Sequence, residues 1–526
     1  MMTVPQVSID VRTFDQAYLT QRISEARARG KRLGLDEAPI FAVPRNRAIL
    51  VDGVHVYAQL LDYHDQIQEQ GRETEASHKR ILQFLHLYYS TTDRVIEEFE
   101  AQRVDYHGPR LHAVVVTPTG DERQRVLRAV AFAITLKETI EAAGRDFGGS
   151  RLRTRVRIGI DTGRAVAVSS GRGADLDPLF LGSPANHAAK RAEGYRPGIY
   201  LSDRARKVLS KPTVGGAYER STALAEERQY GGANTAYGQT QFGYDPSLTR
   251  ARVQAAARAL KSDLDLDALT SPEARFHFHC YEPPLRTIDF AELMPSRSIR
   301  MALGSVFADL SGFTAYVDAC ILTGRIAEMT ANLHVIRGEL AACARDDFAA
   351  KKVRFIGDCL HALIAIGTRM ATEPAATVDA AVMLTGGLRS SFDLCRSMLS
   401  GLGMMGVAIG AEYGETPISR IGIRGERSVR CASSKAVSAS EALQSDLTGR
   451  QTALGPVALV NASAAVKTYF GRGSVEGLDH TQAERLVSPG RIVSPTGPAG
   501  VSSGLLISQG TAASGAVRER GSGRHA

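Results

Sequence analysis

Two apolar stretches of the chain each end in an acidic residue at a turn. Residues 306–316 (VFADLSGFTAY) predict a strand with Asp309 at its end, a turn through Gly312 and an amphipathic helix that starts near Thr314. Residues 351–365 (KKVRFIGDCLHALIA) predict a strand, a tight turn at Gly357 and Asp358, and a second apolar strand. If this hairpin pairs with the first strand, the two carboxylates lie on neighbouring strand ends and can share one or two divalent cations.

The turn after Asp309 has features of a phosphate site. A glycine turn that opens a helix presents backbone N–H groups, here those of Gly312, Phe313 and Thr314, which can donate to phosphate oxygens. An acid followed by glycine at a strand end is more often a plain turn, so the first motif alone is only suggestive. The second acid, Asp358, favours a site for a metal-bound polyphosphate.

A similar pattern occurs nearer the N-terminus. Residues 47–57 (RAILVDGVHVY) have the shape of the stretch around Asp309, residues 108–115 (GPRLHAVV) match 357–364 (GDCLHALI), and residues 157–163 (RIGIDTG) correspond to 406–414 (GVAIGAEYG). Three glycine pairs anchor these matches, with offsets of 259, 249 and 251 residues: Gly53 and Gly312, Gly108 and Gly357, Gly163 and Gly414. Near-constant offsets predict two copies of one domain.

Each copy predicts an α+β domain with a mainly antiparallel sheet. In the second copy we expect helices at residues 321–344 and 375–395. Between the copies we expect a helix at 249–269 and a late strand of the first domain at 275–281. The predicted organisation is a helical N-terminal extension (1–40), a first domain (41–210), an insertion and linker (211–300), a second domain (301–475) and a disordered tail rich in Gly, Ser and Ala (476–526).

Composition narrows the classes of function. The chain has 526 residues, and its net charge of +8 would suit an acidic small molecule or a nucleic acid. Lys and Arg are scattered without an RNA-binding or helix-turn-helix signature, so no nucleic-acid partner is expected. The six cysteines have no metal-ligand spacing and are typical of a reducing, cytoplasmic compartment. We find no apolar run of about 18 residues and no secretory signal, so no membrane partner is expected.

Together, FADLSGFT at residues 307–314 and GDCLHA at residues 357–362 resemble the paired motifs of the class III nucleotide cyclase homology domain. That family has a ferredoxin-like core and works as head-to-tail pairs, so the resemblance implies tandem domains that form a pseudo-dimer within one chain, or a homodimer. It also implies two divalent cations, Mn²⁺ or Mg²⁺, held by Asp309, Asp358 and the backbone carbonyl of Leu310. The 3′-OH of a nucleoside triphosphate would attack its α-phosphorus, and diphosphate would leave.

The two copies differ at the acidic positions. By the glycine register, Asp309 corresponds to Leu50 and Asp358 to Pro109. The first domain is therefore expected to be degenerate, without a metal site of its own.

The first domain carries a different part of the resemblance. Residues 180–191 (FLGSPANHAAKR) are similar to the family's GxxVNxAxR segment, whose Asn orients the ribose and whose Arg stabilises charge on phosphorus. Asn186 matches the Asn, Lys190 takes the register of the Arg, and Arg191 follows one step on. The resemblance thus implies one complete catalytic site per chain, shared between the two domains.

The residue that reads the base is left open by the sequence. Purine cyclases read the base three residues before the glycine of the hairpin turn and near the Asn segment, and these positions hold Asp105, Arg354 and Leu179. Neither purine signature is complete. Arg354 can donate to uracil carbonyls, while Asp105 can accept from uracil N3–H or from a cytosine amino group. The composite arrangement places Asp105 in the complete site and Arg354 in the degenerate one.

The chain most resembles the pyrimidine cyclases of Pycsar anti-phage defence systems, over about residues 40–470. Arg354 in VRFIGD, residues 425–430 (GERSVR) in place of the Asn segment, and residues 283–290 (PPLRTIDF) carry this resemblance. It implies conversion of UTP to cyclic UMP, a second messenger sensed by a separate effector. Cyclic CMP synthesis, a purine cyclase and a non-catalytic nucleotide sensor are the alternatives.

Overall fold

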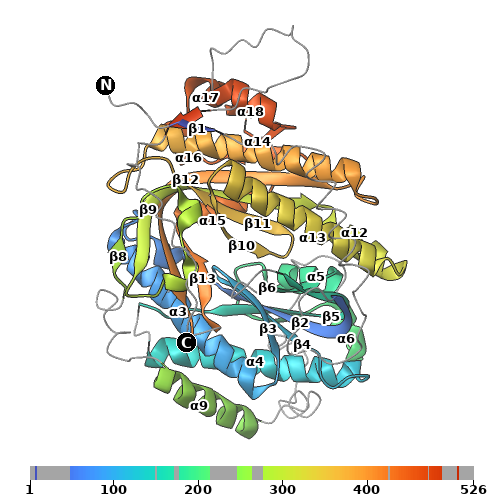
Figure 1. The fold of residues 1–526 in the computed structure, drawn as a ribbon. Helices are drawn as coiled ribbons and strands as arrows, with labels where there is room; N and C mark the ends of the chain where they lie inside the picture. Colours follow the sequence, from blue (N-terminus) through green and yellow to red (C-terminus); the bar gives the residue numbers. More distant parts are fainter. Residues whose placement is uncertain are drawn as a thin grey trace, which may run out of the picture.

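The structure, a computed structural model, is built around two β-sheets (Figure 1). It describes residues 6–8, 48–147, 151–170, 177–213, 246–263, 276–423, 427–471, 473–487 and 506–508. Most of the predicted N-terminal extension, part of the central insertion and most of the predicted tail lie outside these residues. The domain limits therefore stay predictions.

The first sheet lies in the lower half of Figure 1. Its strands are β2 (Ala48–Leu60), β3 (Gln102–His107), β4 (Arg110–Val115), β5 (Val156–Ser170), β6 (Asp177–Leu181) and β7 (Gly198–Leu201). Their order is β3-β4-β2-β5-β6, and β7 pairs parallel with β5. The helices of this half are α2 (Tyr63–Ile67), α3 (Glu75–Glu98), α4 (Glu122–Asp146), α5 (Ser183–Ala192), α6 (Asp203–Val208) and α9 (Pro246–Asp263).

The second sheet repeats this order. Its strands are β8 (Phe278–His279), β9 (Ser298–Ser311), β10 (Lys351–Ile356), β11 (Cys359–Ile364), β12 (Gly406–Ile421), β13 (Val429–Ala432), β14 (Gln451–Leu454) and β15 (Val475–Glu476). The order β10-β11-β9-β12 matches β3-β4-β2-β5, and β14 pairs parallel with β12 as β7 does with β5. The two domains are therefore copies of one fold.

Helices complete the second domain. They are α12 (Phe313–Leu322), α13 (Ile326–Ala342), the π-helical turn Cys343–Asp347, α14 (Pro374–Met398), α15 (Lys435–Ser445), α16 (Pro456–Asn461), α17 (Ala464–Phe470) and α18 (His480–Val487), with two short 3₁₀ turns at Leu285–Thr287 and Phe290–Glu292. The helix predicted at 321–344 is confirmed as α13, but it begins at Ile326, because Gly324 adopts a left-handed φ of +72° and separates it from α12. The helix predicted at 375–395 is confirmed as α14.

The two domains share their hydrophobic cores. Ile421, Val429 and Cys431 of the second domain belong to the core cluster of the first. Leu179 and Leu181 of the first domain belong to the main core cluster of the second. This mutual burial joins the tandem domains into one pseudo-dimer within the chain.

The structure corrects the register of the first strand. Tyr57 on β2 lies opposite His112 on β4, and Phe307 on β9 lies opposite His361 on β11. Tyr57 is therefore the counterpart of Phe307, 250 positions apart, and the match of Gly53 with Gly312 was wrong by nine residues. Pairing of β2 with β4 continues to Gln59, so Gln59, and not Leu50, is the counterpart of Asp309.

The prediction for residues 275–281 is wrong, and the prediction of a helical N-terminal extension is wrong at the three residues that the structure describes. The strand expected to close the first sheet is β8, which instead pairs with β9 of the second sheet and is joined to it by the bond from Ser298 N–H to the His277 carbonyl oxygen at 2.9 Å. Residues 6–8 of the N-terminal extension form a short strand, β1 (Gln6–Ser8), paired with β16 (Leu506–Ser508), and the other residues of the extension lie outside the described part of the chain.

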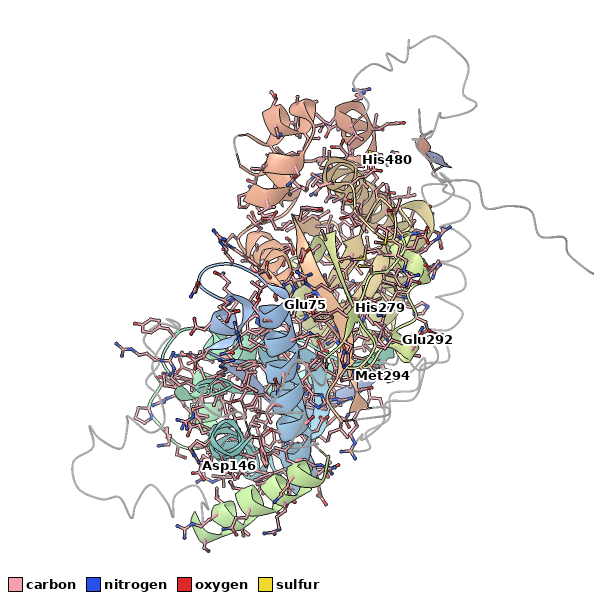
Figure 2. All side chains as sticks on the ribbon, turned by 90° about the vertical axis from the view of Figure 1, so that its left-hand side faces the viewer. Glu75, Asp146, His279, Glu292, Met294 and His480 are labelled. Carbon is pink, nitrogen blue, oxygen red and sulfur yellow. The ribbon has the colours of Figure 1, made fainter. Side chains whose placement is uncertain are left out.

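Residues 480–487, assigned to a disordered tail, form helix α18. It packs on α14 at Gly386, where a Cβ would lie 2.6 Å from the Asp479 carbonyl oxygen and 2.8 Å from the Ala483 Cβ. Figure 2 shows His480 at the start of α18, where its backbone N–H donates to Ser390 Oγ of α14 at 2.9 Å. A glycine on a long helix thus allows the close approach that orders this segment.

Five of the six cysteines are buried and Cys280 is exposed; all six are free thiols. Among the residues that the structure describes, no helix has the length and apolar character needed to cross a bilayer.

Candidate active site

The two predicted acids lie together. Asp309 is the first half-buried residue after the fully buried run 303–308 on β9, and Asp358 lies in the turn between β10 and β11 beside it. Burial raises the pKa of Asp309 to about 6. Burial, followed by the negative charge of Asp309, raises the pKa of Asp358 well above its usual range, against hydrogen bonds from its own and the Leu310 backbone N–H and the charge of Arg337. Two neighbouring carboxyl groups whose ionisation is opposed by burial, and in Asp358 also by the charge of Asp309, form a donor set suited to a cation.

The donor set fits a hard divalent cation that completes its shell with substrate oxygens. Within the described part of the chain, no group of three or more His, Cys, Asp or Glu side chains could hold a metal alone. Mg²⁺ and Mn²⁺ commonly bind through one or two carboxylates together with substrate phosphates and water. Asp309, Asp358 and the backbone around Leu310 match that pattern.

The predicted phosphate turn directly follows. Gly312 has a left-handed φ of +83° and precedes α12, and a Cβ there would lie 3.4 Å from the Met404 carbonyl oxygen. Among the described residues, no side chain caps the first turn of α12. The N-terminal N–H groups at Gly312, Phe313 and Thr314 thus meet the conditions for binding phosphate oxygens.

Helix α5 of the first domain meets this turn across the domain interface. Asn186 donates from Nδ2 to Thr314 Oγ1 at 3.1 Å. Lys190, one helical turn further on, is exposed and shares a face with Asn186, whereas Arg191 belongs to the buried stripe of α5 and is 3% exposed. Of the two basic side chains predicted from the sequence, the exposed Lys190 is better placed than the buried Arg191 to bind a phosphate.

The candidate base-reading residues Asp105 and Arg354 do not lie in separate sites. Arg354 NH1 forms an ion pair with Asp105 Oδ1 at 2.6 Å and also donates to the Tyr106 carbonyl oxygen, while its NH2 donates to the Arg430 carbonyl oxygen at 2.5 Å. The expectation that the interface would divide them is wrong, because β3 and β10 face each other across it (Figure 1). Leu179 is buried in the core shared by the domains.

Tyr57 was not among the site residues predicted from the sequence. Its ring stacks on His112 with centroids 3.9 Å apart, and His112 Nε2 lies 3.0 Å from His55 Nδ1. Burial, then the charge of Asp105, raises the pKa of Tyr57 above its usual range, and the charge of Asp358 also contributes. Tyr57 therefore lies near both Asp358 and Asp105.

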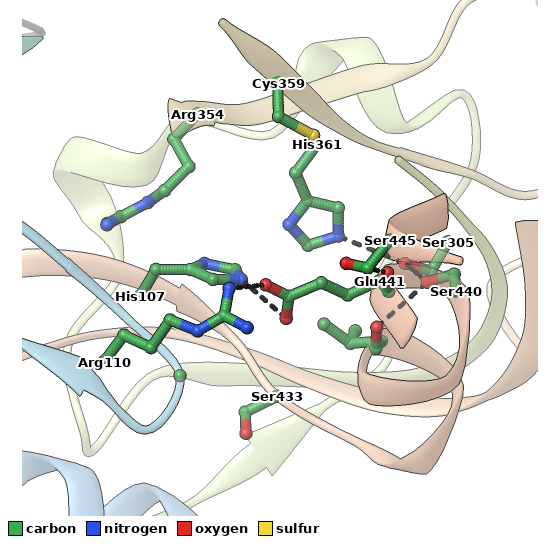
Figure 3. A network of polar contacts seen from close by, with 12 residues as sticks. His107, Arg110, Ser305, Arg354, Cys359, His361, Ser433, Ser440, Glu441 and Ser445 are labelled. Carbon is green, nitrogen blue, oxygen red and sulfur yellow. Dashed lines mark hydrogen bonds and ion pairs between the residues drawn. The ribbon is translucent and has the colours of Figure 1, made fainter. Parts of the chain in front are cut away.

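The corresponding cleft on the other side of the pseudo-dimer has an equivalent stack of an aromatic ring on a histidine, but it lacks the two acids. Phe307 stacks on His361 with centroids 4.1 Å apart, but Gln59 and Pro109 replace the two acids. Glu441 of α15 enters this cleft, where Arg110 and His107 bind its carboxylate at 2.7 Å and 3.3 Å (Figure 3).

The surroundings of Glu441 favour its ionised form. Burial alone would raise the pKa of Glu441, but the charge and hydrogen bond of His107 and the charge of Arg110 outweigh it and lower the pKa to about 2. An internal ion pair therefore closes the second cleft. Neither Glu441 nor its two partners was singled out in the sequence.

Known proteins with similar sequences and structures were found for this chain. No family model matches it. The chain is 50% identical over 495 residues to a uridylate cyclase of a Rhizobium species, with 93% of each chain covered. It is 36% identical over 461 residues to a uridylate cyclase of Pseudomonas aeruginosa, with 84% of each chain covered. A crystal structure of a class III adenylyl cyclase-like ATP-binding protein from Pseudomonas aeruginosa superposes with a TM-score of 0.80 at 32% identity and covers 92% of this chain and 100% of that one.

Proposed function

Because this chain belongs to the uridylate cyclase family and has the tandem class III cyclase-like fold, we propose that it converts UTP to 3′,5′-cyclic UMP and diphosphate. One observation carries the proposal: the Asn186–Thr314 hydrogen bond brings the nucleotide-orienting helix of the first domain against the metal and phosphate turn of the second. Each domain thus contributes half of one catalytic site.

Asp309, Asp358 and the Leu310 carbonyl oxygen would hold two divalent cations, Mn²⁺ or Mg²⁺. Such cations, when bound, lower the pKa of the ribose 3′-OH and neutralise charge on the triphosphate. The raised carboxyl pKa values support this assignment, since a cation would relieve the repulsion between the two acids.

The remaining groups bind and orient the substrate. Backbone N–H groups from Gly312 to Thr314 donate to the triphosphate, and Asn186 orients the ribose so that the 3′-OH attacks the α-phosphorus in line. Lys190 stabilises the charge that develops on the phosphoryl oxygens, with Arg191 as the less favourably placed alternative. No covalent intermediate is needed.

Uracil would be read beside Tyr57, where Asp105 can accept from N3–H. The Asp105–Arg354 ion pair is already formed, so a base that uses either partner replaces or joins that contact. Leu179 would contribute only apolar packing.

Two further statements belong to the same proposal. The product would act in the cytoplasm as a second messenger in anti-phage defence, sensed by a separate effector protein. Because a related solved structure is described as ATP-binding, adenine nucleotides are the competitors to test, along with CTP and GTP.

The test is incubation of the purified full chain with ATP, GTP, CTP or UTP in Mn²⁺, with products separated by chromatography. We expect cyclic UMP as the main product and its loss in Asp309→Asn. The matched control is Gln59→Ala, which changes the counterpart of Asp309 in the closed cleft and should keep full activity. Cyclic CMP or a cyclic purine as main product would overturn the assignment of the base, and nucleotide binding without any cyclic product would favour a sensor.

A further inference from the structure

Two corresponding helices, α5 and α15, begin at the interface, and each is capped by a carboxylate of the other domain. The first backbone N–H of α5, that of Ser183, donates to Asp318 Oδ1 of α12 at 2.9 Å. The first backbone N–H of α15, that of Lys435, donates to Glu73 Oε1 of the first domain at 2.7 Å. The pseudo-dimer therefore has a reciprocal pair of caps, one on the helix of the candidate active site and one on the helix that carries Glu441.

The helices depend on these caps to different degrees. α15 has a cap of its own, because Ser434 Oγ accepts from the Val437 N–H at 3.1 Å. α5 follows Gly182, which has a φ of +132° and no side chain to accept a hydrogen bond. The carboxylate of Asp318 thus supplies, from the other domain, the acceptor and the negative charge that a helix N-terminus favours.

Asp318 lies on the same face of α12 as Thr314, which accepts the hydrogen bond from Asn186. Thr314 and Asp318 are one helical turn apart on α12, and they accept from Asn186 and Ser183, which are three residues apart on α5. α12 begins directly after the phosphate turn, so these two bonds set the position of α5 relative to that turn. On the side of the first domain, α5 is held by His187, whose Nδ1 lies 3.1 Å from Asp161 Oδ2.

We propose that Asp318 is a positioning residue for the cyclase reaction: its bond to the Ser183 N–H holds α5 so that Asn186 and Lys190 face the metal and phosphate turn. This inference rests on the proposed function. It assigns to Asp318 no contact with substrate. Its effect on the reaction passes through the helix that it caps.

The experiment compares Asp318→Ala and Asp318→Asn with Glu73→Ala. Loss of the acceptor at Asp318 should lower kcat for cyclic UMP formation by about 10- to 100-fold with a much smaller change in KM, because a small displacement of an orienting group costs the transition state more than ground-state binding. Asp318→Asn keeps an acceptor oxygen and should restore most of kcat. Glu73→Ala removes the same kind of cap at the closed cleft and should leave kcat within about threefold.

Hydrogen exchange of residues 183–192 supplies a readout that does not depend on turnover. Exchange in this segment should rise in Asp318→Ala and not in Glu73→Ala, and similar melting temperatures of the two variants would separate local positioning from global unfolding. Equal kcat in Asp318→Ala and Glu73→Ala, or no rescue by Asp318→Asn, would overturn the inference while the proposed function stands. A wild-type protein that forms no cyclic nucleotide would overturn both.

Discussion

Replacement of Glu441 by Gln tests whether an ion pair closes the second cleft. The change keeps the size of the side chain and removes the charge that Arg110 and His107 bind. The pKa of Glu441 falls from 4.5 to about 2 in the folded protein, and the side chain is only 18% exposed. At about 1.4 kcal/mol per pKa unit, this difference corresponds to a stabilisation of about 3 kcal/mol.

The pH dependence has a definite sign. Because the pKa is lower in the folded protein than in the unfolded chain, the stabilisation is complete above a pH of about 4.5 and is lost as the pH falls toward 2. The free energy of unfolding of wild type should therefore exceed that of Glu441→Gln near neutral pH, and the difference should shrink steadily as the solution is acidified. Guanidinium denaturation followed by circular dichroism at several pH values measures this difference directly.

Other acids also titrate in this range, so the quantity of interest is the difference between the two proteins and not the acid sensitivity of either. Glu98→Gln, on the exposed face of α3, controls for the amide substitution itself. A difference between wild type and Glu441→Gln that stays constant with pH would refute the reasoning, because the stabilisation would then not depend on the charge of Glu441.

Three further changes test other parts of the arrangement. Lys190→Ala should lower kcat for cyclic UMP formation by about 100-fold without loss of stability, since Lys190 is exposed; an unchanged kcat in steady-state assays would remove it from the site. Asp105→Asn should destabilise the protein by about 3 kcal/mol in denaturant titrations, because Arg354 stays buried without its counter-charge, and Arg354→Met in the same chain should recover part of the loss. Gly386→Ala should cost about 1–3 kcal/mol and expose residues 480–487 to limited proteolysis, since a Cβ there overlaps the Asp479 carbonyl oxygen; protection equal to wild type would contradict this packing.

Local patterns predicted the elements around Asp309, Gly312 and Asp358 correctly. The strand before Asp309, the turn at Gly312 and the hairpin around Asp358 depend on apolar runs and glycines that lie close together in sequence. The pairing of β11 with β9 then brings the two acids together, as the hairpin argument expected. Sequence patterns of this kind report local structure well because few residues decide it.

The register of β2 was not predictable in the same way. Residues 53–56 are all buried, polar His55 included, so polarity in this segment does not mark an exposed face of the strand. Matching Gly53 to Gly312 replaced that missing information with a residue type and failed, because β2 continues past Gly53 to Leu60. The conclusion that the first domain lacks the acids survived only because Gln59, the true counterpart of Asp309, is not acidic either.

Contacts between distant parts of the chain were also out of reach. Glu441 and Arg110 are 331 positions apart, and Arg354 and Asp105 are 249 apart. The sequence marked Asp105 and Arg354 as candidates without indicating that they pair, and it did not mark Glu441 or Arg110. Each of these contacts depends on how the two domains face each other. The docking of the domains, and not any single motif, therefore decides which charges meet.

The two clefts show how a duplicated fold can divide its tasks. A Cβ on Gly159 would meet the Ala188 carbonyl oxygen, and a Cβ on Gly410 would meet that of Ser440, so Ala189 is the counterpart of Glu441. In the proposed site, a carboxylate at position 189 would lie on the same helix as Asn186 and Lys190 and would repel a triphosphate, whereas the carboxylate of Glu441 binds Arg110 and joins the domains. Two identical subunits would carry the same residue in both clefts and could not satisfy both requirements. Joining the copies in one chain lets the site proposed to bind substrate and the interface stabilised by Glu441 carry different residues.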